Sequence, residues 1–138
     1  MADVDDKLQN AMTVLQSVTP PFLPAEGEVM TISVEWPPGE SGLPPHRHPG
    51  GPCFGYVLDG EMLFELEGED PRVIKAGEAF WEPGGEVIHY QDANNRTDIP
   101  LRFVVTMIMA PGQPMLVFVD DDELKQSGWV RRSAGSST

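Results

Sequence analysis

Apolar and polar residues alternate along most of the chain. From Glu28 to Trp36 the two kinds of side chain take turns with a period of two, as in a half-buried β-strand. Similar short runs recur, each bounded by Gly, Pro, Asn or Asp. The further predicted strands are 45–48, 53–58, 61–67, 72–75, 79–82, 87–91, 101–109 and 115–119. This cadence, with no helical pattern between strands, predicts an all-β sandwich or closed barrel rather than a parallel, doubly wound sheet.

One helical pattern precedes the strands. Between residues 4 and 18, apolar side chains recur at spacings of three and four and share one helix face. Asp3 can cap its start, and the Thr19-Pro20-Pro21 stretch ends it, because proline disfavours helical geometry in the residue before it. We therefore expect a short N-terminal helix over about 4–18, a barrel over about 28–119 and a flexible tail over about 133–138.

Length and charge limit the classes of function. A chain of 138 residues suits one compact domain, so we expect a single domain over 1–138. Acidic residues number 22 against 9 basic ones, a net charge of −13 that disfavours nucleic acid and anionic membrane surfaces as partners. The acidic run over residues 120–123 is interpreted as solvated surface. We expect a small-molecule substrate or ligand instead.

The N-terminal sequence and the cysteine content indicate the compartment. The opening Met-Ala-Asp-Val-Asp-Asp has neither the basic head nor the apolar stretch of a secretory signal. Cys53 is the single cysteine, so an intramolecular disulfide is impossible and a reducing compartment is the simplest setting. We expect a cytoplasmic protein.

All three histidines lie in strand-like sequence. His46 and His48 are two residues apart, so in an extended strand their side chains leave the same face. His89 follows the Pro83-Gly84-Gly85 turn in another predicted strand. Three imidazoles on rigid strands commonly hold a divalent transition metal, and Cys53 is positioned either as a soft fourth ligand or as a wall of the pocket. The alternative is that these are exposed polar residues near a proline-rich turn.

The same residues resemble the two signature motifs of the cupin superfamily. The stretch from Pro45 to Gly60 resembles the motif G-x5-H-x-H-x3-4-E-x6-G, and the stretch from Gly77 to Asn94 resembles G-x5-P-x-G-x2-H-x3-N, with one extra residue on each side of His89. The resemblance covers roughly residues 28–110. It implies a small antiparallel jelly-roll β-barrel with a metal inside.

The metal-binding glutamate of the first motif falls at position 53, where this chain has cysteine. Some thiol dioxygenases within the cupins are similar in this respect, and the comparison matches His46, His48, Cys53 and His89 one for one. Three histidines hold ferrous iron in those enzymes. The resemblance therefore implies metal ligation by the three histidines and leaves the role of Cys53 open between ligand and pocket wall.

Three residues are candidates for direct contact with a substrate: Cys53, Gln91 and Tyr56. Gln91 follows His89 by two and should share its face, where it can hydrogen-bond a substrate, a ligand water or an outer histidine nitrogen. Tyr56 is the phenol available to the pocket, because alternation places Tyr90 opposite His89.

We interpret the chain as a metal-dependent cupin, with a non-haem iron dioxygenase-type oxidoreductase as the first hypothesis. Three imidazoles leave coordination positions open for dioxygen or a chelating substrate. Fe(II) is favoured, while Mn, Ni, Cu and Zn are compatible. The alternatives are a metal-dependent isomerase or lyase, a non-catalytic metal- or ligand-binding protein, and a structural zinc site. We also expect a homodimer, since small barrels commonly pair to cover open strand edges.

Overall fold

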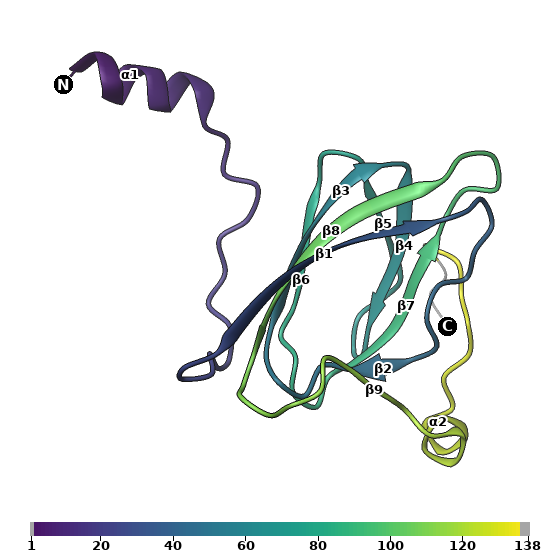
Figure 1. Cartoon of the computed structure of the whole chain (residues 1–138). Helices are drawn as coiled ribbons and strands as arrows, with labels where there is room; N and C mark the ends of the chain where they lie inside the picture. The colour runs from purple at the N-terminus through teal and green to yellow at the C-terminus, as the bar shows by residue number, and fades with distance from the viewer. Residues whose placement is uncertain (1, 136–138) are drawn as a thin grey trace.

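The computed structural model describes residues 2–135 and consists of two antiparallel sheets facing each other (Figure 1). The first sheet has the order β1-β8-β3-β6, with strands Glu28–Trp36, Leu101–Met109, Cys53–Asp59 and Ala79–Glu82. The second has the order β5-β4-β7-β2-β9, with strands Arg72–Lys75, Glu61–Leu66, Ile88–Asn94, His46–Arg47 and Val117–Phe118. The prediction of an all-β, antiparallel jelly roll with a short N-terminal helix is confirmed.

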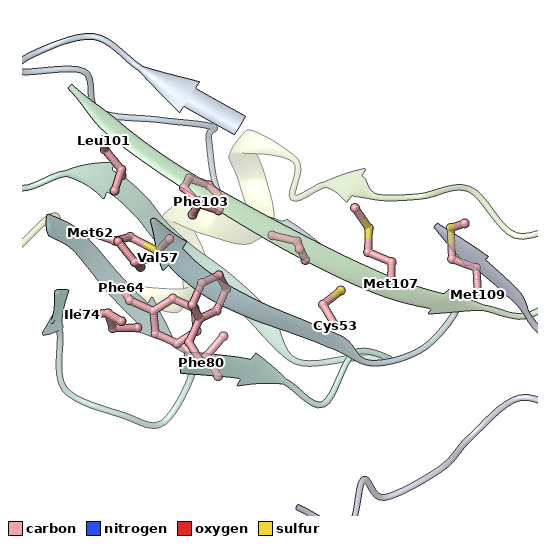
Figure 2. Packing of buried hydrophobic residues seen from close by; sticks show 12 residues of the cluster. Cys53, Val57, Met62, Phe64, Ile74, Phe80, Leu101, Phe103, Met107 and Met109 are labelled. Atoms are coloured by element: carbon pink, nitrogen blue, oxygen red, sulfur yellow. The ribbon is translucent and has the colours of Figure 1, made fainter. Parts of the chain in front are cut away.

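The core lies between the two sheets. Strand β8 alternates along its whole length between buried and less buried residues, so one side of it faces the interior. Figure 2 shows these inward side chains continuing along β8 from Leu101 to Met109, with Phe64 and Phe80 packed beside them. The Phe64 and Phe80 rings lie 5.3 Å apart, and each is at most 2% exposed. Burying such a side chain contributes about 1.5–3 kcal/mol, which makes this cluster the main source of the barrel's stability.

The N-terminal helix is shorter than predicted. Helix α1 spans Ala2–Ala11 and lies away from the barrel (Figure 1), whereas residues 12–18 have no helical structure. Met12 and Leu15 stay about half exposed, and Gln16 Nε2 donates a hydrogen bond to the Phe80 carbonyl. The prediction of a helix to residue 18 is wrong because residues 12–18 make contacts with the outer face of the first sheet. The helix that remains is short, and a short helix gains little stability without a surface to pack on.

A second helix was not predicted. Helix α2 spans Asp121–Ser127, inside and just beyond the acidic run. The Asp120 side chain accepts a hydrogen bond from the Glu123 backbone N–H, and Gly128 ends the helix at a φ of 74°. None of its residues is buried, in agreement with the interpretation of the acidic run as surface.

The segment after α2 returns to the second sheet. The Trp129 ring stacks on Tyr90 with ring centroids 4.8 Å apart. Residues 133–135 follow, and the rest of the predicted flexible tail, 136–138, lies outside the described residues. No helix in the described part of the chain is long and apolar enough to span a membrane.

Candidate metal centre

The structure brings the three histidines together inside the barrel. His46 on β2 pairs across the sheet with His89 on β7, and His48 follows β2 by one residue. Ring nitrogens of all three lie within 4.8 Å of one another, and each residue is at most 7% exposed. The two stretches of sequence that carry the motif resemblance therefore meet at one point.

Backbone carbonyls fix the protonation of two rings. The Nδ1 of His46 lies 2.8 Å from the Pro44 carbonyl oxygen, and the Nδ1 of His48 lies 2.9 Å from the Met115 carbonyl oxygen. A carbonyl oxygen can only accept, so each Nδ1 carries a proton, and in the neutral ring Nε2 is the nitrogen with the free lone pair. Hydrogen bonds of this kind orient histidine ligands in metal sites.

Glycines hold the loop beyond His48 in place. The Gly85 backbone N–H donates to the His48 carbonyl oxygen over 2.8 Å. Gly84 has a φ of 75°, and a Cβ there would meet the Gly51 carbonyl oxygen. The turn that precedes His89 thus packs directly on the loop that follows His48, which explains the need for glycine at Gly84.

The sequence analysis missed one residue of the site, Glu82 at the end of β6. Its Oε1 lies 3.2 Å from His89 Nδ1 and 3.5 Å from His48 Nε2, and the residue is 5% exposed. Glu82 pairs across the sheet with Cys53, the position where the motif expects glutamate. The signal for it was strand alternation, because Glu82 is two residues after the inward-facing Phe80.

Cys53 has a different environment. It is 1% exposed and belongs to the hydrophobic cluster, and it is not among the residues that line the site's cavity. Its Sγ is near enough to His48 and Glu82 to join a ligand set. Burial, reinforced by the Glu82 charge, raises the pKa of the Cys53 thiol far above its usual range. The thiol is therefore protonated at neutral pH, and Glu82 supplies the negative charge.

The charges of the site are complementary to a cation. Burial, together with the neighbouring His89, lowers the pKa of His46 to about 4, so this ring is neutral at pH 7. Burial alone would raise the pKa of Glu82, but the histidines, His89 above all, lower it to about 2. Burial likewise opposes protonation of His89, and the Glu82 charge outweighs it and raises the pKa of His89. A buried carboxylate among imidazoles favours a positive charge at their centre.

The unpaired ring nitrogens of His89, within the described residues, are a second indication that a metal ion binds between the histidines. Within the described part of the chain, neither of its ring nitrogens has a hydrogen bond of acceptable geometry, although Nδ1 lies 3.2 Å from Glu82 Oε1. Buried polar atoms in native structures almost always have a partner. A metal ion accepting a lone pair from His89 would supply it, so the donor set fits a divalent transition metal.

Strand alternation places Tyr56 outside the barrel. Cys53, Gly55 and Val57 on β3 are buried, whereas Tyr56 is partly exposed and borders a surface groove together with Met12. The prediction that Tyr56 faces the pocket is therefore wrong. Tyr90 points away from the histidines, as predicted, and stacks on Trp129.

Gln91 is also outside, for another reason. The pairing of β4 with β7 shifts by one residue, so that Leu66 is opposite His89 and Glu65 is opposite Gln91, with Tyr90 as the extra residue. This β-bulge reverses the alternation beyond His89. Gln91 donates a hydrogen bond to Glu65 over 2.8 Å and accepts one from Arg131. The prediction that Gln91 shares the face of His89 is wrong because period-two counting does not survive a bulge.

A cavity of about 100 Å³ adjoins the histidines. Its ionisable lining residues, within the described chain, are His46, His48, Glu82, His89 and Asp92. The remaining lining side chains are apolar or aromatic and come mainly from β1 and β8. The candidate site is thus a small, largely apolar chamber whose polar groups gather around one cluster of imidazoles.

Comparison with protein families matches residues 32–109, more than half of the chain, to the cupin domain family. Among solved structures, the chain is similar to the DMSP lyase DddQ from Ruegeria pomeroyi DSS-3, with 25% identity and a TM-score of 0.54 over 66% of this chain and 43% of that one. It is similar to an oxalate oxidase in complex with glycolate, with 26% identity and a TM-score of 0.55 over 75% of this chain and 57% of that one.

An RmlC-like cupin with a double-stranded β-helix fold from Methanocaldococcus jannaschii is alike in fold, with 23% identity and a TM-score of 0.52 over 71% of this chain and 84% of that one. The chain spans about half the length of the lyase and the oxidase. The search of curated proteins found no match. The family match over residues 32–109, on a two-sheet barrel with converging histidines, shows that the chain belongs to the cupin family.

Proposed function

We propose that this cupin is a metal-dependent enzyme, a non-haem iron dioxygenase-type oxidoreductase that acts on a small molecule. In this proposal His46, His48, His89 and Glu82 hold the metal. The observation that carries it is the convergence of two imidazole Nε2 lone pairs, fixed by backbone carbonyls, with a buried carboxylate in an apolar chamber. Fe(II) is the favoured ion, and Mn, Ni, Cu and Zn suit the same donors.

Each part of the chain has a role in this proposal. The histidines and Glu82 would hold the ion at the wall of the cavity. When bound, the ion would supply open coordination positions for dioxygen and a chelating substrate. The apolar side chains of β1 and β8 keep water out, which strengthens electrostatic interactions inside the chamber. Cys53 contributes packing beside the ligands.

The relatives support metal-dependent chemistry in general terms. One similar structure is an oxidase and another is a lyase, so the fold is compatible with different reactions. A metal-dependent lyase or isomerase is therefore the second candidate, supported by the likeness to the DMSP lyase. The choice of a dioxygenase-type reaction is based on the residues that line this chain's cavity, not on the relatives. A cytoplasmic setting and a homodimeric state are part of the same proposal.

The experiment begins with the metal. Purified protein is analysed for bound elements, and oxygen uptake is then measured with thiols, 1,3-diketones and catechols. We expect close to one metal per chain and oxygen uptake that depends on one substrate class. His46→Ala and His48→Ala remove both, whereas Asp59→Asn, an exposed surface change, leaves both unchanged. A metal-loaded protein without oxygen uptake that instead eliminates or isomerises a substrate favours the second candidate.

A non-catalytic or structural role makes different predictions. A barrel with a full hydrophobic core keeps its fold when the metal is chelated and loses only a few degrees of melting temperature. Unfolding upon chelation would favour a structural zinc site. Bound metal with no turnover of any substrate class would favour a binding protein.

A further inference from the structure

We propose that Asp92 is the acid–base residue of the cavity, and that the cavity takes a neutral, weakly acidic oxygen ligand, such as an enolisable 1,3-diketone, whose proton passes to the Asp92 carboxylate. This inference rests on the proposed function, because it assigns a substrate class to the same metal site. Asp92 thus takes the place in the cavity that strand alternation had predicted for Gln91.

The β-bulge in β7 gives Asp92 this position. Because Tyr90 is the extra residue, Phe64 pairs with Asp92 and Leu66 pairs with His89. Phe64 and Leu66 both belong to the hydrophobic cluster, so their partners face the interior as well. Asp92 is 6% exposed and lines the same cavity as the histidines. A carboxyl group therefore borders the space that a substrate would occupy.

The charge balance of the cavity selects the ligand. Among the described lining residues there is no lysine or arginine, and the carboxyl groups are those of Glu82 and Asp92. Once Asp92 has taken up a proton, a divalent ion with neutral histidines and the Glu82 carboxylate leaves one positive charge. A monoanionic ligand neutralises it, whereas a dianion such as oxalate leaves an uncompensated negative charge in an apolar chamber, which is costly.

Asp92 is suited to receive the proton. Burial raises the pKa of its carboxyl group, with the Glu82 charge adding to this and His89 opposing it. His89 and Glu82 are the charged groups that act on it, while the Leu43 backbone N–H and Phe64 face it from neighbouring segments. The enol O–H bond breaks, its electron pair stays on the ligand oxygen, and an O–H bond forms on Asp92. The proton stays inside the protein, and the total charge of the chamber stays at zero.

A purely structural role is the competing explanation. Asp92 Oδ1 accepts a hydrogen bond from the Leu43 backbone N–H over 2.8 Å, and the Asp92 carbonyl accepts one from Trp36 Nε1 over 3.0 Å. Both contacts anchor the loop that leads to His46. Asp92→Asn keeps an oxygen acceptor for Leu43 and removes only the proton acceptor, so it separates the two roles.

The test counts protons with acetylacetone as the probe. Metal-loaded protein is titrated with acetylacetone by calorimetry at pH 7 in two buffers of different ionisation enthalpy, and the difference in heat gives the protons released per ligand bound. For the wild type we expect close to zero protons released per acetylacetone bound. Asp92→Asn should release close to one proton and bind acetylacetone at least about tenfold more weakly, with unchanged metal content. The control Asp59→Asn removes an exposed carboxyl group and should match the wild type.

The outcomes distinguish this inference from the proposed function. Wild-type protein that retains no metal overturns both. Metal-loaded wild type and Asp92→Asn with the same proton count show that Asp92 is a loop anchor, which overturns the inference and leaves the metal site intact. Oxalate binding to the wild type more tightly than acetylacetone overturns the substrate class, and this arm needs no variant to fold.

Discussion

The ligand set is tested most directly by moving the carboxylate of the metal site from Glu82 on β6 to position 53 on β3. Glu82 on β6 is opposite Cys53 on β3, the position where the motif expects glutamate. Glu82→Gln removes the charge and keeps the shape of the side chain. Cys53→Glu combined with Glu82→Gln then places the charge on the other strand of the same pair.

The pKa of Glu82 gives the expected magnitude. A decrease from 4.5 to about 2 corresponds to a preference of roughly 3 kcal/mol for the charged carboxylate among the histidines. An ion in that place gains at least a comparable amount. We therefore expect Glu82→Gln to weaken metal binding by about 100-fold or more. The double variant should recover most of this loss, and Cys53→Ser should lose little metal while altering any catalytic activity.

Competition with a chromophoric chelator measures these affinities, with Co²⁺ or Zn²⁺ added to metal-free protein. Circular dichroism of each variant verifies that the barrel is intact. Full affinity in Glu82→Gln would refute the assignment of Glu82 as a ligand. Loss of metal in Cys53→Ser would show that the thiol, in spite of its raised pKa, loses its proton and binds the ion.

Three further predictions concern acid, packing and assembly. Metal affinity should fall as pH decreases, because protons compete for the imidazoles. The raised pKa of His89 makes it take up a proton before His46 does, since the pKa of His46 is lowered to about 4. A constant affinity from pH 5 to 8, measured with the same chelator, would contradict histidine ligation. Phe64→Ala should destabilise the protein by about 3–5 kcal/mol in urea unfolding, because this ring packs 4.9 Å from His89 and 5.3 Å from Phe80; a loss below about 1 kcal/mol would show that the core closes around the gap. Light scattering coupled to gel filtration should give the mass of two chains, and the mass of one chain would rule out the homodimer.

Local patterns were sufficient to predict the barrel. Strand β1 was predicted at its observed bounds, Glu28–Trp36, because half-buried strands show alternation directly. His46 and His48 were identified for the same reason, since a spacing of two fixes a shared face in extended chain. The N-terminal helix was predicted too long because residues 12–18 contact the outer face of the first sheet in a non-helical conformation, which no local pattern reveals.

The remaining parts of the site depend on pairing between strands. Glu82 reaches the histidines only because β6 pairs with β3, a contact between segments about 30 residues apart in sequence. Gln91 and Asp92 exchanged places because of a single unpaired residue in β7. Helix α2 was missed because the acidic run over residues 120–123 was interpreted only as solvated surface, whereas in the structure Asp120 caps a short helix that ends at Gly128.

The extra residue in β7 has a consequence for how the interior of the barrel can change. Pairing Tyr90 regularly would restore period-two alternation and present the Gln91 amide to the chamber in place of the Asp92 carboxyl group, whereas deleting Tyr90 would remove the bulge and keep Asp92 inside. Trp129, from the far end of the chain, stacks on Tyr90 from outside. One unpaired residue in β7 thus decides whether a carboxyl group or an amide borders the chamber.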